Sequence, residues 1–211
     1  MQFFSYTIGG IDIQTECTKY VKQHGKLSQG DVFCSKAGKL QCKMVAHAVG
    51  PIWNGGSKNE EDDLYNCVLK CLEHTDKGSY TSIAIPAIST GIYGYPKDKA
   101  TKVIVSAIND YINTSPRSQI RKIYLCDVSD DTVKCFIAGM KKIFGRDNVK
   151  QLVDPEATVT PWKKQTDHKP GMVSLYSVFP SIRLCNVYLP YQYCLMGDMG
   201  KFLIFHQCII S

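Results

Sequence analysis

The stretch that decides the fold is IAIPAISTGIYGYP, residues 83–96. An apolar run changes into small residues, and a helical pattern of apolar side chains follows over about residues 97–112. This order predicts a buried strand, a glycine-rich loop and a helix. Gly91 and Gly94 favour turns with positive φ, and without a Cβ they leave main-chain N–H groups uncovered. Because the positive end of the helix would face the loop, we expect a phosphorylated ligand there. The alternative is a strand-to-helix turn that binds nothing.

A second buried strand is indicated by QCKMVAHAVGPIW, residues 41–53, at a distance that fits one intervening helix. His47 lies in the middle of this strand between two alanines, where a histidine is more often structural than a catalytic base. Strand and helix patterns alternate from residue 11 to residue 144, which favours an α/β fold with a mostly parallel sheet. Ligands of such folds bind beyond the carboxyl ends of the strands, where the 89–95 loop is expected.

Several segments together resemble one known family, the macrodomains, and they are residues 13–17, 35–40, 41–53, 89–96, 123–128 and 132–136. These sequence segments are most similar to the tandem macrodomains of the interferon-linked, poly(ADP-ribose)-polymerase-like mono-ADP-ribosyltransferases. The resemblance covers about residues 9–147. It implies a three-layer α/β/α fold and recognition of ADP-ribose, free or attached to protein. It also implies that the first two strands of the family, and the asparagine-rich and glycine-rich loops after them, are missing before Ile11.

The resemblance implies two sets of ligand contacts. The diphosphate is expected on Ser89, Thr90, Gly91, Ile92, Tyr93 and Gly94, with the Tyr93 ring over the ribose or the diphosphate. The adenine end is expected at Val128 and Ser129. Many macrodomains carry Phe near the Val128 position, so a stacking partner for adenine is lost. Asp127 is either a polar anchor or the cap of the last helix.

Three functions compete on these residues. We favour a reader of ADP-ribosylated proteins, with ADP-ribose as ligand and no cofactor, catalytic residue or metal. An ADP-ribosyl hydrolase is the second possibility, but the family's hydrolases hold the activated water with the loops that are missing here. The third is a ligand-free fragment with an interaction or regulatory role. NAD-dependent transferase activity would belong to a separate domain of a parent protein.

Composition limits the remaining possibilities. The 211 residues carry a net charge of +6 without a concentrated basic stripe, so a nucleic-acid partner is not expected. Lys97, Lys99 and Lys102 form either a solvated helix face or a means of steering a diphosphate. The ten cysteines contain no Cys-x-x-Cys pair, and the spacing of Cys67 and Cys71 is typical of a helix core. We expect a soluble protein of the nucleus or cytoplasm, with no signal peptide and no membrane span.

The predicted organisation has three parts. Residues 1–147 form a partial macrodomain, residues 148–171 a proline-punctuated linker, and residues 172–211 a tail unlike the family. The tail is interpreted as an alternative C-terminal end without its own fold. A competing interpretation is that segments such as 186–189 and 202–205 complete the sheet left short by the missing strands.

Overall fold

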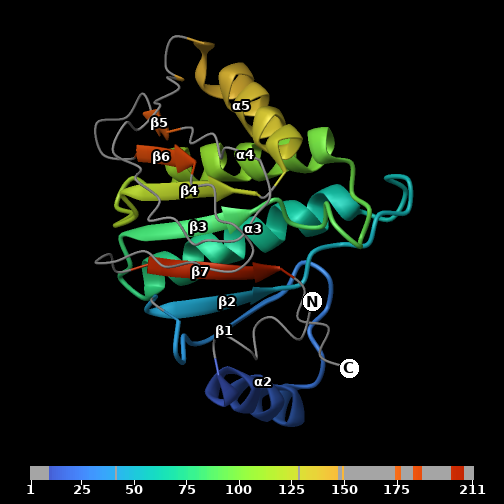
Figure 1. Cartoon of the computed structure of the whole chain (residues 1–211), viewed down its shortest axis with the longest axis vertical. Coiled ribbons are helices and arrows are strands. Elements are labelled where there is room, and N and C mark those ends of the chain that lie inside the picture. Colours follow the sequence, from blue (N-terminus) through green and yellow to red (C-terminus); the bar gives the residue numbers. More distant parts are fainter. Residues whose placement is uncertain are drawn as a thin grey trace, which may run out of the picture.

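A seven-stranded sheet with helices on both faces organises the described part of the chain (Figure 1). The computed structural model describes residues 10–40, 42–127, 129–146, 149, 174–176, 183–186 and 201–206. Its helices are α2 (Ile11–His24), α3 (Glu60–Lys77), α4 (Lys97–Thr114) and α5 (Asp130–Phe144). Its strands are β1 (Val32–Lys36), β2 (Met44–Ala48), β3 (Ser82–Pro86), β4 (Lys122–Cys126), β5 (Ser174–Tyr176), β6 (Arg183–Asn186) and β7 (Lys201–His206).

The sheet has the strand order β1-β2-β7-β3-β4-β6-β5. The five inner strands are parallel to one another, and β1 and β5 run antiparallel at the two edges. Pairing of β3 with β4 aligns Ser82 with Lys122 and Pro86 with Cys126. The prediction of an α/β fold with a mostly parallel sheet is therefore confirmed.

The alternation of side chains along β2 shows why the fold has three layers. Ala46 and Ala48 belong to the large core that includes buried residues of α3, α4 and α5. Val45 belongs instead to a smaller cluster with Ile13 and Cys17 of α2. Because successive strand residues point to opposite faces, α2 covers one face of the sheet and the other three helices cover the opposite face.

The helices follow the apolar patterns of the sequence. α2 begins at Ile11 and ends at His24, and Gly25 follows with φ 82°, a backbone conformation that favours glycine. In α4, the residues Ile104, Ala107, Ile108 and Tyr111 form a buried stripe at helical spacing. None of the helices in the described residues is long and apolar enough to cross a bilayer.

Strand β7 supplies the least expected feature of the topology. It lies between β2 and β3, so that Leu203 pairs with Val45 on one side and with Ala84 on the other. Likewise β6 pairs with β4, aligning Ile123 with Leu184. Segments after residue 173 thus take part in the same sheet as the family-like part. The proposed domain boundaries at 147 and 171 stay predictions, and apart from Val149 the linker lies outside the described residues.

Candidate functional site

The site is built at the carboxyl edge of the parallel strands. β2, β3 and β4 all end at this edge, where their arrowheads point the same way in Figure 1. Three connections therefore meet there: residues 49–59 after β2, residues 87–96 after β3, and the short turn after β4. This is the edge at which open α/β sheets bind ligands.

The 89–94 loop holds its shape through backbone hydrogen bonds and two residues in the left-handed region. Ser89 has φ 67° and Gly94 has φ 68°. The Tyr95 amide donates to the Ser89 carbonyl at 2.9 Å, and the Gly94 amide donates to the Gly91 carbonyl at 2.9 Å. The expectation of a positive φ at Gly91 is wrong, because the turn places that conformation at Ser89. A left-handed serine is uncommon, and the surrounding bonds maintain it.

The tip of the loop presents unused donors. Within the described residues, no hydrogen bond engages the amides of Gly91 and Ile92. Gly91 is exposed, and a Cβ added there would meet no atom within 4 Å. The 18-residue helix α4 begins three residues after the loop, and its N-terminal amides carry partial positive charge. Two adjacent free amides and a helix N-terminus are the groups that bind an oxyanion.

The two hydroxyl groups of the loop differ in their surroundings. Ser89 is fully buried, and its Oγ has no hydrogen-bond partner in the described part of the chain. Thr90 is half-buried, and its Oγ1 donates to the Ala87 carbonyl at 2.8 Å. The Thr90 hydroxyl is thus occupied as a donor within the loop, whereas Ser89 keeps both its donor and its acceptor capacity.

Gly50, at the end of β2, packs directly against this loop. A Cβ at Gly50 would lie 2.5 Å from Ile88 Cγ2 and closer still to Ser89 Oγ. Only glycine allows this approach of the two strand ends. The sequence analysis did not assign Gly50 to the site, although the Gly-Pro after the second predicted strand was a signal for a close approach.

Tyr93 joins the loop to the segment after β2. The Trp53 amide donates to the Tyr93 carbonyl at 2.9 Å. The Tyr93 side chain is half-buried, and burial raises the pKa of its phenol. On either side of this junction, Ile92 is 79% exposed and Ile52 is 46% exposed. The rim of the site therefore carries apolar surface.

Ser129 lies close to the start of α4. Lys97 Nζ donates to Ser129 Oγ at 3.0 Å, and the Ser129 amide donates to Asp127 Oδ1 at 2.8 Å. The structure thus brings Ser129 near the loop-bearing helix, and Asp127 orders the turn into α5. Thr132, in the first turn of α5, has a buried Oγ1 without a hydrogen-bond partner among the described residues. Val128 lies outside the described residues.

A cavity of about 690 Å³ adjoins the loop at Tyr93, and we call it the Tyr93 cavity. Its walls come from the segment before β1, the end of β2, the start of α3 and the loop itself. The lining residues are Leu27, Ser28, Gln29, Val49, Gly50, Ile52, Asn54, Lys58, Asp63 and Tyr93.

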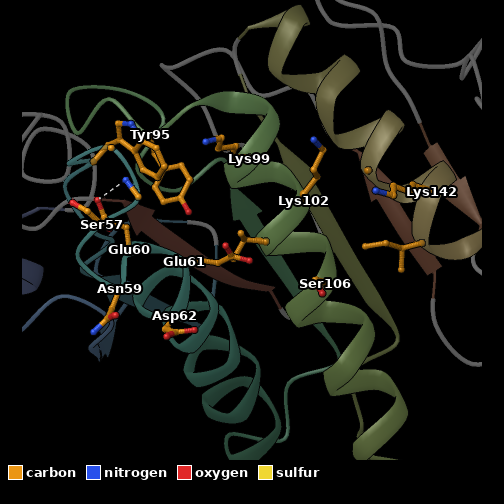
Figure 2. Close-up of a pocket in the computed structure, with 16 residues that line it drawn as sticks. Ser57, Asn59, Glu60, Glu61, Asp62, Tyr95, Lys99, Lys102, Ser106 and Lys142 are labelled. Atoms are coloured by element: carbon orange, nitrogen blue, oxygen red, sulfur yellow. Dashed lines mark hydrogen bonds between the residues drawn. The ribbon is translucent and has the colours of Figure 1, made fainter.

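A second cavity, of about 720 Å³, runs across α3, α4 and α5, and we call it the helical groove (Figure 2). Lys99, Lys102 and Lys142 line one side, and Glu61 and Asp62 of α3 line the other. Lys99 Nζ lies 5.0 Å from the centre of the Trp53 ring, and Lys102 pairs with Asp98 at 3.6 Å. The groove therefore has mixed charge.

The loop between the two cavities is organised by Glu60, which the sequence analysis did not single out. Its buried carboxylate accepts backbone hydrogen bonds from Asn54 at 2.8 Å, Gly56 at 3.1 Å and Lys58 at 2.6 Å. Burial alone raises the pKa of this carboxyl, but the backbone donors outweigh burial and lower the pKa to about 2. Asn59, directly before α3, makes no side-chain cap hydrogen bond, and its backbone is left-handed with φ 59°.

His47 lies in a buried cluster beneath α2. Its Nε2 is 2.8 Å from Ser35 Oγ and 3.7 Å from Cys17 Sγ, and its ring stacks on Phe33. It is fully buried, on the sheet face opposite α3, α4 and α5. This is the environment of a structural histidine. Across the described residues, no group of three or more His, Cys, Asp or Glu could hold a metal ion.

Fold and site together define an α/β protein with an amide-lined loop at the carboxyl edge of its sheet. The Macro domain family model matches residues 6–104. An O-acetyl-ADP-ribose deacetylase from Citrobacter rodentium is 35% identical over 127 residues, which are 60% of this chain and 71% of that protein. The chain belongs to the macrodomain family.

Two further similarities agree with this assignment. Human protein mono-ADP-ribosyltransferase PARP14 is 39% identical over 139 residues, which are 64% of this chain and 8% of PARP14. A solved mutant of the Oceanobacillus iheyensis macrodomain with ADPR has a TM-score of 0.60 and 25% identity, covering 65% of this chain and 74% of that one. The chain spans a small part of PARP14, and 21% of another relative from Thermotoga maritima.

Proposed function

We propose that this chain is an ADP-ribose-binding module that reads ADP-ribosylated proteins through the 89–94 loop. The observation that carries the proposal is the free pair of amides at Gly91 and Ile92, set beside the N-terminus of α4. Hydrogen bonds from such donors to a charged oxygen contribute about 1.5–3 kcal/mol each. The helix N-terminus adds about 0.3–1 kcal/mol for a bound anion.

The remaining predicted contacts have roles that fit this ligand. The Ser89 hydroxyl lies under the loop without a hydrogen-bond partner among the described residues, and the half-buried Tyr93 lies at the end of the loop where the ribose is expected. Ser129, where the adenine end is expected, lies just before α5 and accepts a hydrogen bond from Lys97 at the start of α4. A solved relative carries ADPR, which supports the choice of ADP-ribose over other phosphorylated ligands.

Calorimetric titration of ADP-ribose into the full chain tests the proposal, with Gly91→Glu as the decisive variant. The substituted carboxylate would lie where the diphosphate is expected, and it would repel the ligand. Because a Cβ at Gly91 meets open space and φ is not positive, the variant should fold. Gly91→Ala is the matched control, expected to keep the wild-type affinity. If Gly91→Glu binds as tightly as wild type, the loop assignment is wrong.

A hydrolase is the second candidate, favoured by one observation: the chain covers 71% of an O-acetyl-ADP-ribose deacetylase at 35% identity. Among the described residues of the site, the Asp127 carboxylate accepts a hydrogen bond from the Ser129 amide. This bond engages the carboxylate in holding the turn before α5. Acetate release from O-acetyl-ADP-ribose distinguishes the two functions. Binding without turnover supports the reader, and turnover above the rate in buffer supports the hydrolase.

A further inference from the structure

The Tyr93 cavity lies where a ligand on the diphosphate loop would extend. Tyr93 belongs to both the loop and the cavity wall. Gly50, also in the wall, packs against Ser89 of the loop. At about 690 Å³ the cavity is within the range of small-ligand sites, and Gly91 and Ile92, on which the diphosphate is expected, are not among its lining residues. The cavity is thus free to hold whatever is attached to the ligand.

The cavity contains a carboxylate, Asp63, that forms no ion pair with any residue the structure describes. Asp63, in the first turn of α3, is half-buried, and its side chain makes no hydrogen bond or ion pair with any described residue. Burial raises the pKa of its carboxyl, and the nearby charges of Asp62, Glu60 and Asp31 raise it further. Lys70 opposes this effect, but its Nζ lies on Asp31 at 2.6 Å. A cation entering the cavity would meet a carboxylate that pairs with no described residue.

Apolar surface is exposed beside the cavity, at Ile52 in its wall and at Ile92 next to Tyr93. Three large hydrophobic side chains are exposed in the described part of the chain, and two of them, Ile52 and Ile92, belong to the segments joined by the Trp53–Tyr93 hydrogen bond. Exposed isoleucines contribute little to binding a nucleotide. They suit a polypeptide, because apolar side chains beside a ligand site favour contact with a protein surface.

We propose that the Tyr93 cavity binds the protein part of an ADP-ribosylated ligand and selects acceptor segments with lysine or arginine next to the modified residue, the cation pairing with Asp63. This inference rests on the proposed reader function. It assigns the specificity for the acceptor segment to residues outside the diphosphate loop. Lys58, also in the cavity wall, is exposed, and among the described residues it forms no ion pair with Asp63.

The test compares three probes by fluorescence-anisotropy competition on the full chain. They are free ADP-ribose, a peptide mono-ADP-ribosylated on one residue with lysines on both sides, and the same peptide with glutamates in place of the lysines. Wild type should prefer the lysine peptide to the glutamate peptide by about two- to fivefold, the size expected of a partly exposed ion pair. The preference should fade in high salt.

Two variants connect that preference with Asp63. Asp63→Asn should abolish the discrimination and leave the affinity for free ADP-ribose unchanged. Asp63→Lys should reverse the preference toward the glutamate peptide. Asp62→Asn is the matched control, because Asp62 neighbours Asp63 on the same helix but lines the helical groove. This control should behave as wild type, and thermal melts check that each variant is folded.

The two ways of failing are distinct. If wild type binds free ADP-ribose but treats both peptides alike, or if Asp63→Asn keeps the preference, the inference is overturned and the reader function stands. If wild type binds none of the three probes, the reader function itself fails, and the inference falls with it.

Discussion

Replacing Gly50 by alanine tests whether the end of β2 holds the diphosphate loop in place. The new Cβ would lie 2.5 Å from Ile88 Cγ2 and closer to Ser89 Oγ, and both residues are fully buried. Neither side chain can turn into solvent, so the loop must shift. Overpacking of this kind costs about 1–3 kcal/mol. The smaller entropy of alanine in the unfolded chain returns about 0.4–1 kcal/mol, because φ at Gly50 is not positive.

The expected net loss is about 1–2 kcal/mol, which lowers the melting temperature by about 2–8 °C in a chain of this length. Differential scanning fluorimetry measures the shift. Gly91→Ala is the control, since its Cβ meets nothing within 4 Å, and we expect its melting temperature to equal or exceed that of wild type. ADP-ribose affinity should fall in Gly50→Ala and stay unchanged in Gly91→Ala.

A double-mutant cycle with Ser89→Gly identifies the clash. The second substitution removes the closer contact and places glycine at φ 67°, so it should restore part of the stability lost in Gly50→Ala. Unchanged melting of Gly50→Ala, or strictly additive effects in the cycle, would refute the reasoning.

Three further perturbations test other parts of the structure. Glu60→Gln should lower the melting temperature at pH 7, and since the pKa of Glu60 is lowered from 4.5 to about 2, the difference from wild type should shrink as the pH falls from 4.5 toward 2 in a series of melts. Leu203→Pro should cost more than about 3 kcal/mol or prevent cooperative unfolding in a urea titration, because β7 pairs on both sides; Leu175→Pro in the edge strand β5 should cost less. Tyr111→Phe should cost about 1–2 kcal/mol by chemical denaturation, because it removes the hydroxyl that donates to the half-buried carboxylate of Asp76, and an unchanged midpoint would contradict that role.

The strand, loop and helix around residues 83–96 were predictable because each has a local signal. The apolar run predicts β3, the glycines predict the loop, and the helical spacing predicts α4, which begins at Lys97 as expected. The first helix also has a local end signal, the glycine at position 25, and in the structure Gly25 follows α2 with positive φ. Recognition of the family rested on the same segments.

The partners of the strands were harder to predict because pairing is a long-range property. Residues 202–205 have no pattern that tells a central strand from an unstructured apolar tail, yet β7 joins β2 to β3 across more than a hundred residues of chain. The role of Glu60 depends on three amides brought near it by a loop, and the left-handed Ser89 depends on the bonds around it. A glutamate or a serine in the sequence does not by itself predict the role of Glu60 or the left-handed backbone of Ser89.

The most direct test of the reader function is a thermal melt of the full chain with and without millimolar ADP-ribose. A ligand that binds only the folded state adds about 2.7 kcal/mol of stability at a hundredfold excess over Kd. For a chain of this length, that corresponds to a rise of about 5–10 °C in the melting temperature, which is the result we predict. A cooperative melt at the same temperature with and without ADP-ribose would contradict it.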